Sequence, residues 1–142
     1  MHILQEKRGL NMKLLTNENF VDKAKEAVDS LRNERDNKGR PYIVTTSKIR
    51  NLLAMTADIY NEVMLLREEI LDERIKGRIA YLRVRCLYES GRDRNEPVKV
   101  FVKNSKLLDI LPTIETKKDY ILFSHYMEAL VAWRKYIYPN DN

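Results

Sequence analysis

Residues 74–92 constrain the fold more than any other stretch, because the spacing of their side chains suits one α-helix with two different faces. At about 100° per residue, one face is aliphatic at the i, i+3/i+4, i+7 spacing of a buried surface, and the other alternates arginine with tyrosine. We therefore expect the helix to dock on a core and to hold its arginines outward. The aliphatic stripe is Leu71, Ile75, Ile79, Leu82 and Cys86; the arginine–tyrosine column is Arg74, Arg78, Tyr81, Arg85, Tyr88 and Arg92.

The residue types of the arginine–tyrosine column indicate what it contacts. Arginine presents a planar fork of N–H donors that fits phosphate oxygens, and tyrosine adds a hydroxyl group and a flat ring on which a base stacks. The column therefore predicts contact with the backbone of a nucleic acid rather than with a small substrate. The alternative interpretation is a solvated charged face with tyrosines at its edge.

The shortage of turn-forming residues favours helices over a many-stranded sheet. The chain of 142 residues contains only four glycines and four prolines, and 44% of it is hydrophobic, which is enough for one domain with a real core. We expect an all-α fold, a compact bundle of about five helices with short connections. The single cysteine, on the aliphatic stripe, indicates a reducing, cytoplasmic location and a core role.

Hydrophobic periodicity and capping residues predict where these helices lie. The N-terminal segment 1–15 has no secure pattern and is expected to be flexible, ahead of a single domain over 16–142. A charged stretch at 33–42 is expected to be a mobile linker. The expected helices start near Asn19, run from the caps Thr45 and Thr46 to about Leu71, span 74–92, start at Pro97, cover 107–111, and run from the capping box Thr116–Asp119 to Tyr138.

The positive charge of the chain is concentrated. The whole chain carries a formal charge of +5, whereas residues 74–106 hold ten basic and three acidic side chains. The local excess therefore exceeds the excess of the whole chain. A localised basic surface on a nearly balanced remainder is typical of a protein that binds a polyanion.

Residue patterns for catalysis or metal binding are absent from the sequence. The two histidines are 123 positions apart, and His125 near Glu128 is interpreted as structural. There is no cysteine pair, no H-x-x-x-H and no glycine-rich phosphate loop, so no catalytic residue, metal or cofactor is expected. No run of about 18 apolar residues occurs, so no membrane span is expected.

Four stretches in order resemble the small-subunit family of the Csm complex, the type III-A CRISPR effector that is an RNA-guided antiviral ribonucleoprotein. They are TTSKIRNLLAMTADIYNEV (45–63), IAYLRVRCLYESGR (79–92), VKVFVKNSKLLDILPTI (98–114) and FSHYMEALVAWRKY (123–136). The resemblance covers nearly the whole chain from about Phe20, and leaves out residues 1–15 and 33–42.

The resemblance implies a non-catalytic helical subunit whose partners are guide RNA, target RNA, the large and backbone subunits of the Csm complex and further copies of itself. Basic side chains would hold the sugar-phosphate backbone, because specificity in such a machine comes from base pairing. The candidate RNA-binding residues are Lys48, Arg50, Arg78, Arg83, Arg85, Arg92, Lys103 and Arg134. Arg83 departs from the arginine–tyrosine column by about 180°, so it serves a different contact or is solvated.

Two other classes of protein remain as alternatives. A helical adaptor would bind only protein, with its basic face against an acidic partner. A helix-turn-helix DNA regulator ranks last, because no short turn followed by a polar recognition helix is found in the sequence.

Overall fold

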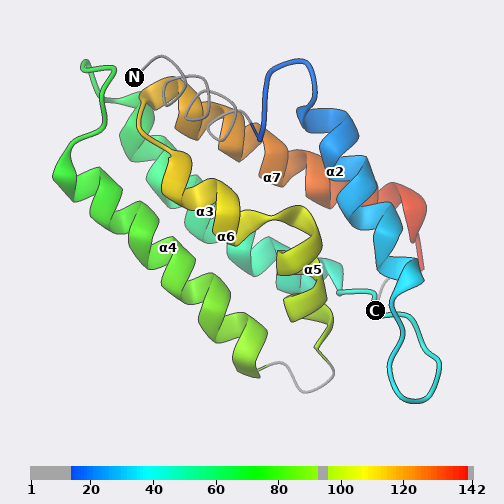
Figure 1. The fold of residues 1–142 in the computed structure, drawn as a ribbon. Coiled ribbons are helices and arrows are strands. Elements are labelled where there is room, and N and C mark those ends of the chain that lie inside the picture. Colours follow the sequence, from blue (N-terminus) through cyan, green and yellow to red (C-terminus); the bar gives the residue numbers. More distant parts are fainter. Residues whose placement is uncertain (1–13, 93–95, 141–142) are drawn as a thin grey trace, which may run out of the picture.

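The computed structural model describes residues 14–92 and 96–140, and this part of the chain is all-α, as predicted (Figure 1). It holds six α-helices and two short 3-10 helices, and the described residues form no strand beyond two isolated bridges. In chain order the elements are α2 (Phe20–Asp29), η1 (Ser30–Asn33), α3 (Thr46–Met64), α4 (Glu73–Arg92), α5 (Pro97–Ser105), α6 (Leu107–Ile110), η2 (Leu111–Thr113) and α7 (Lys117–Ile137).

The predicted capping residues begin the two long helices α3 and α7. The Thr45 side chain accepts a hydrogen bond from the backbone N–H of Lys48, which satisfies one free donor in the first turn of α3. At α7, Thr116 and Asp119 form a complete capping box, in which each side chain accepts from the backbone of the other residue. Both helix starts are therefore determined by local sequence.

Helix α7 contributes large aromatic side chains to the core, among them Tyr120 and Phe123. It packs against α2 and α3, while α4 packs against α3, α5 and α6 (Figure 1). Tyr120 of α7 is fully buried, and its hydroxyl donates to the carbonyl oxygen of Thr56 at 2.8 Å, so its polar end is satisfied inside the bundle. Burial of the phenol raises the pKa of Tyr120 well above its usual range.

Helix α3 ends earlier than the sequence predicts, at Met64 rather than near Leu71. The residues after it pair instead with the segment that leads into α7. Leu71 N–H donates to the Glu115 carbonyl at 3.0 Å, and Lys117 N–H donates to the Glu69 carbonyl at 2.7 Å. These long-range hydrogen bonds override the helical propensity of a stretch that has no glycine or proline to stop it.

The charged stretch 33–42, predicted to be a linker, forms a hydrogen-bonded turn. Asp36 N–H donates to the Arg40 carbonyl at 2.8 Å, and Gly39 N–H donates to the Asp36 carbonyl at 3.0 Å. Gly39 has φ +77°, the left-handed conformation that glycine adopts without a steric cost. The prediction of a flexible segment at 1–15 falls mostly outside the described residues, and Leu15 itself is buried.

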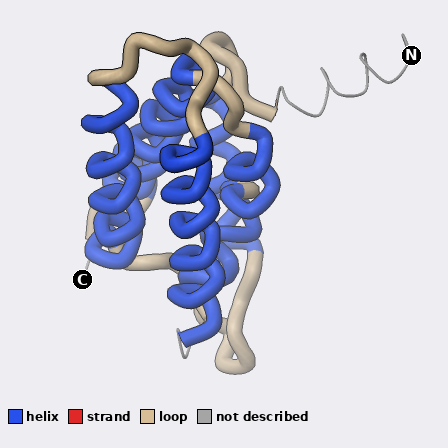
Figure 2. Tube along the Cα trace, turned by 90° about the vertical axis from the view of Figure 1, so that its left-hand side faces the viewer, coloured by secondary structure: helices blue, strands red, loops and turns tan. Residues whose placement is uncertain are grey.

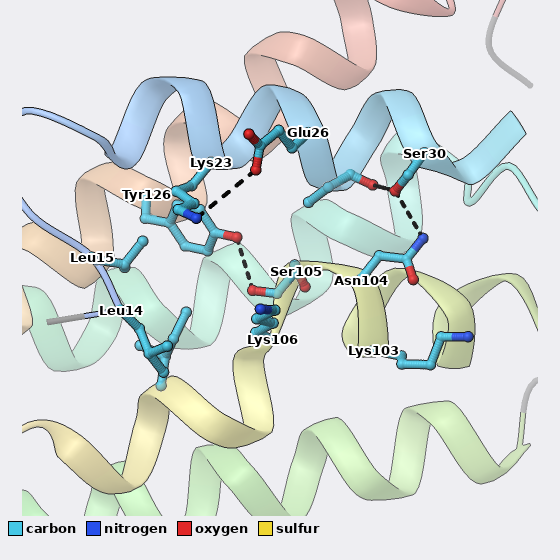
Figure 3. A pocket seen from close by; sticks show the side chains of 12 residues that line it. Leu14, Leu15, Lys23, Glu26, Ser30, Lys103, Asn104, Ser105, Lys106 and Tyr126 are labelled. Carbon is cyan, nitrogen blue, oxygen red and sulfur yellow. Dashed lines mark hydrogen bonds and ion pairs between the residues drawn. The ribbon is translucent and has the colours of Figure 1, made fainter. Parts of the chain in front are cut away.

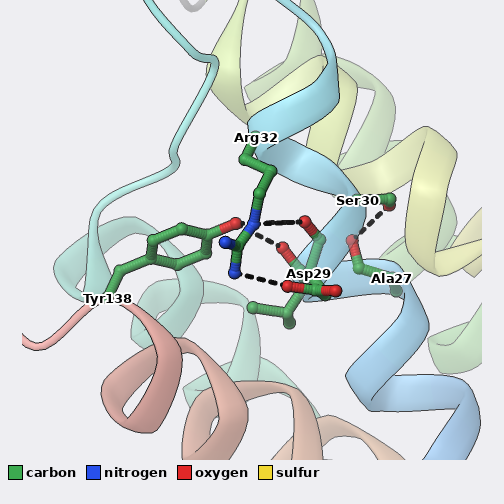
Figure 4. Close-up of polar contacts among 6 residues, drawn as sticks. Ala27, Asp29, Ser30, Arg32 and Tyr138 are labelled. Atoms are coloured by element: carbon green, nitrogen blue, oxygen red, sulfur yellow. Dashed lines mark hydrogen bonds and ion pairs between the residues drawn. The ribbon is translucent and has the colours of Figure 1, made fainter.

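The C-terminal end of α7 is tied to the end of α2. The Tyr138 hydroxyl donates to the carbonyl oxygens of Val28 and Asp29, at 3.1 and 3.2 Å. The guanidinium of Arg32 lies 5.5 Å from the centre of the same ring and pairs with the Asp29 carboxylate (Figure 4). This polar cluster closes the bundle at a point on α2 and α7, away from the arginines of α4.

Helix α4 lies at the side of the bundle. Figure 2 is seen from that side, and one face of α4 points toward the viewer with no helix over it. The opposite face carries the aliphatic stripe, whose members Ile75, Ile79, Leu82 and Cys86 are all buried, as predicted. Burial raises the pKa of the Cys86 thiol to about 11, which suits an inert core residue.

Candidate nucleic-acid interface

The arginine–tyrosine column lies along one flank of α4 and is accessible to a ligand. Tyr81 is 62% exposed and Tyr88 is 54% exposed, so both residues are open to solvent. The side chains of the four arginines are between 35% and 61% exposed. Guanidinium groups and phenol rings therefore reach solvent on the same flank, as the helical periodicity predicts.

The N-terminal half of the column is organised by Glu62 of α3. Its carboxylate accepts from Arg74 at 2.7 Å and also pairs with Arg78. One carboxylate on α3 thus lies between two arginines one turn apart on α4. The arrangement joins the two helices and holds both guanidinium groups beside a groove of about 390 Å³ between α3 and α4, which Asp58 and Tyr81 also line.

The C-terminal half repeats this arrangement within α4 itself. The Glu89 carboxylate accepts from Arg85 at 3.0 Å and from Arg92 at 3.1 Å. Both guanidinium carbons also lie close to the Tyr88 ring, at 5.1 and 5.8 Å from its centre. Two cation–π contacts and two ion pairs therefore hold these arginines in defined positions at the surface.

The electrostatics of the column follow from this pairing. In each half two arginines pair with one carboxylate, so the three ion-paired groups of each half carry a net charge of +1. A guanidinium has five N–H donors, and one or two of them satisfy the carboxylate. The remaining donors are available to a second anion, so the column can bind phosphate without losing its internal ion pairs.

Two further candidates, Lys48 and Arg50, lie in the first turns of α3 and are exposed. Helices α3 and α4 are antiparallel (Figure 1), so the start of α3 lies at the same end of the bundle as the last turns of α4. This end also carries the N-terminus of α3, where the positive end of the helix dipole favours an anion.

The structure separates Arg83 and Lys103 from the column. Arg83 lies on the other flank of α4, around a pocket of about 130 Å³ lined also by Leu111 and Pro112. Lys103 belongs to α5, pairs with Glu34 at 2.5 Å, and lines a pocket of about 370 Å³ between α2 and α5 (Figure 3). Neither residue lines the groove beside Arg74, Arg78 and Tyr81.

Arg134 does not join the exposed basic residues, contrary to its inclusion among the candidates. It is 3% exposed, and its guanidinium donates to the carbonyl oxygens of Val44 and Tyr138, at 2.6 and 2.5 Å. The helix turns this side chain inward, where it satisfies two carbonyls at the end of the bundle. We therefore assign Arg134 a role in the stability of the fold and leave it out of the interface.

Comparison with known proteins decides the family. Residues 15–140 match the family described as Csm2 Type III-A, a range that includes every described helix. The chain belongs to the Csm2 family. This confirms the resemblance to the small subunit of the type III-A CRISPR complex.

Three Csm2 relatives show the extent of the similarity. The CRISPR system Cms protein Csm2 of Streptococcus thermophilus is 40% identical over 130 residues, which cover 92% of this chain and all of the relative. The protein of the same name from Mycobacterium tuberculosis is 42% identical over 101 residues, 70% of this chain and 80% of the relative. That of Enterococcus italicus is 35% identical over 126 residues, 83% and 89% of the two chains.

Sequence reasoning missed the two carboxylates of this Csm2-family surface. Glu89 had a local signal, because it stands four residues after Arg85 and three before Arg92, the spacings at which helical side chains meet. Glu62 had none, since its partners are on another helix. Arg74 was part of the column but not among the candidate residues, and the structure adds it through its pair with Glu62.

No group of three or more histidine, cysteine, aspartate or glutamate side chains within residues 14–92 and 96–140 is placed to hold a metal ion. In the same ranges, every helix is too short or too polar to cross a membrane.

Proposed function

We propose that this chain is a non-catalytic subunit of a cytoplasmic type III-A CRISPR complex and binds the sugar-phosphate backbone of guide and target RNA. The observation that carries the proposal is the row of four arginines with two exposed tyrosines on one flank of α4. Lys48 and Arg50, exposed in the first turns of α3, are the further proposed contacts. Further copies of the chain and the other Csm subunits are the proposed protein partners.

The chemistry of the column favours the RNA backbone over base edges. Paired guanidinium groups on a convex helix suit phosphate oxygens, whereas readout of bases needs side chains that enter a groove or hold an unstacked base. Backbone contact alone carries no sequence information. That is the property expected of a subunit in a complex whose specificity comes from guide–target pairing.

A salt titration of RNA binding tests the proposal. The purified full chain is mixed with single-stranded RNA, and the affinity is measured between about 50 and 200 mM salt, where phosphate contacts weaken steeply. Removing Arg78 and Arg85 together by alanine substitution should weaken binding and make the slope of log affinity against log salt shallower by about one to two units, because each lost phosphate contact removes about 0.7.

The matched control is the double variant Lys118→Ala/Lys135→Ala. It makes the same change in net charge with two exposed lysines of α7 that are not part of the column. We expect its slope to equal that of the wild type. No RNA binding by the wild type at low salt, or equal slopes in all three proteins, would contradict the proposal.

A protein adaptor is the second candidate function, and one observation favours it. Val84 and Leu87 are 51% and 54% exposed on the outer face of α4, beside the arginines. An acidic, amphipathic partner would fit an apolar strip with basic edges. In that case the substitutions of Arg78 and Arg85 would leave RNA binding unchanged and would reduce capture of Csm subunits.

A further inference from the structure

The arginines of α4 divide into two units of the same composition. In the first unit Glu62 pairs with Arg74 and Arg78, and in the second Glu89 pairs with Arg85 and Arg92. We call these units the Glu62 clamp and the Glu89 clamp. Each has two guanidinium groups, one carboxylate and a net charge of +1.

The two carboxylates reduce the charge repulsion between neighbouring arginines and limit the motion of their side chains. Like charges three or four residues apart on a helix repel one another, and long free side chains lose conformational entropy when a ligand fixes them. A carboxylate between two guanidinium groups offsets the repulsion and keeps both in place before a ligand arrives. Glu89 is well covered, with a side chain only 16% exposed, while its two arginines remain 35% and 61% exposed.

The same carboxylates compete with a phosphate. A phosphate that reaches the two guanidinium groups of one clamp also comes close to the carboxylate between them, and the two negative charges repel. The carboxylate therefore raises the affinity for phosphate by holding the guanidinium groups in place, and lowers it by its negative charge. Of the two effects, charge repulsion acts over a longer distance and is the one that salt reports.

We propose that Glu62 and Glu89 are positioning residues. Each holds the two arginines of its clamp in place to bind one RNA phosphate, and its negative charge weakens the binding of that phosphate. The proposal rests on the proposed function and deepens it. Arg78 and Arg85 stand seven residues apart, about 10 Å along the helix, so the clamps would contact two different phosphates. The column then contributes about two phosphate contacts to RNA binding rather than four.

Charge-neutral variants separate the two effects. Glutamine keeps an oxygen that accepts from guanidinium but removes the charge, whereas alanine removes both. Glu62→Gln and Glu89→Gln should each tighten binding to single-stranded RNA about fivefold at low salt and steepen the salt slope, since a neighbouring like charge has been removed. Glu62→Ala and Glu89→Ala should tighten it less, because the arginines also lose their positions.

The control is Asp29→Asn, which removes one negative charge from an arginine ion pair elsewhere, on α2, where Asp29 holds Arg32 (Figure 4). Its RNA affinity should stay at the wild-type value. Thermal unfolding of each variant shows whether the fold is kept, and Glu89 lies within one helix, so its variants do not cut the link between α3 and α4.

The outcomes distinguish this inference from the proposed function. If the wild type binds RNA through Arg78 and Arg85 but the folded glutamine variants bind no tighter, competition by the carboxylates is overturned. If the alanine variants bind as tightly as the glutamine variants, the positioning role is overturned. If the wild type does not bind RNA at all, the proposed function fails first and the clamps lose their ligand.

Discussion

Two arginines of this chain, Arg85 and Arg134, each lie against a tyrosine ring but differ in what their N–H donors bind. Arg85 lies on the surface against a carboxylate and a tyrosine ring, with donors left over for a ligand. Arg134 lies inside, with its donors on two backbone carbonyls. In sequence both are arginines on amphipathic helices, so only their surroundings separate the exposed arginine, a proposed RNA contact, from the buried one.

Replacement of the buried arginine should cost stability. We expect Arg134→Ala to lower the free energy of unfolding by about 2–3 kcal/mol, because two carbonyl oxygens lose charged donors in a buried site. Urea unfolding followed by circular dichroism measures the change. Lys135→Ala, an exposed neighbour, should stay within about 0.5 kcal/mol of the wild type, and an equal loss in both variants would contradict the assignment.

At the scale of elements, local signals and long-range contacts determine different ends of the helices. The starts of α3 and α7 follow from capping side chains that stand next to them in sequence. The end of α3 at Met64 follows from hydrogen bonds between residues 69–71 and 115–117, about 45 positions away. Helix starts were therefore predictable here, and this helix end was not.

Two glycines should respond in opposite ways to the same substitution. Gly77 lies within α4, and a Cβ built there meets no atom within 4 Å, so Gly77→Ala should stabilise the chain by about 0.5–1 kcal/mol through reduced backbone entropy of the unfolded state. Gly39 has φ +77°, so Gly39→Ala should destabilise it by about 1–2 kcal/mol. Thermal unfolding of both variants measures the pair, and shifts of the same sign would contradict the account.

At the scale of the molecule, the basic surface is defined by where its positive charges lie rather than by a large net charge. The chain carries a charge of only +5, yet four arginines gather along one flank of α4. Such a surface attracts any phosphate backbone and gives no preference among bases.

The affinity for RNA should therefore depend on salt and hardly on sequence. We expect single-stranded RNAs of equal length and unrelated, unstructured sequence to bind within about threefold of one another at one salt concentration, since phosphate contacts carry no base information. Fluorescence anisotropy with several labelled RNAs measures this. A tenfold preference for one sequence would indicate contacts with base edges and would contradict a backbone-only interface.

The sequence by itself determined what depends on neighbours along the chain: the all-α class, the caps Thr45 and Thr116, the aliphatic stripe and the arginine–tyrosine column. These features rest on helical periodicity and on hydrogen bonds within one turn, which local sequence specifies. The tertiary structure alone decided that Glu62 joins Arg74 and Arg78, that Arg134 turns inward, and that α3 ends at Met64. Each of these depends on residues that are far apart in the sequence and are brought together by packing. No spacing pattern in the sequence predicts such a contact.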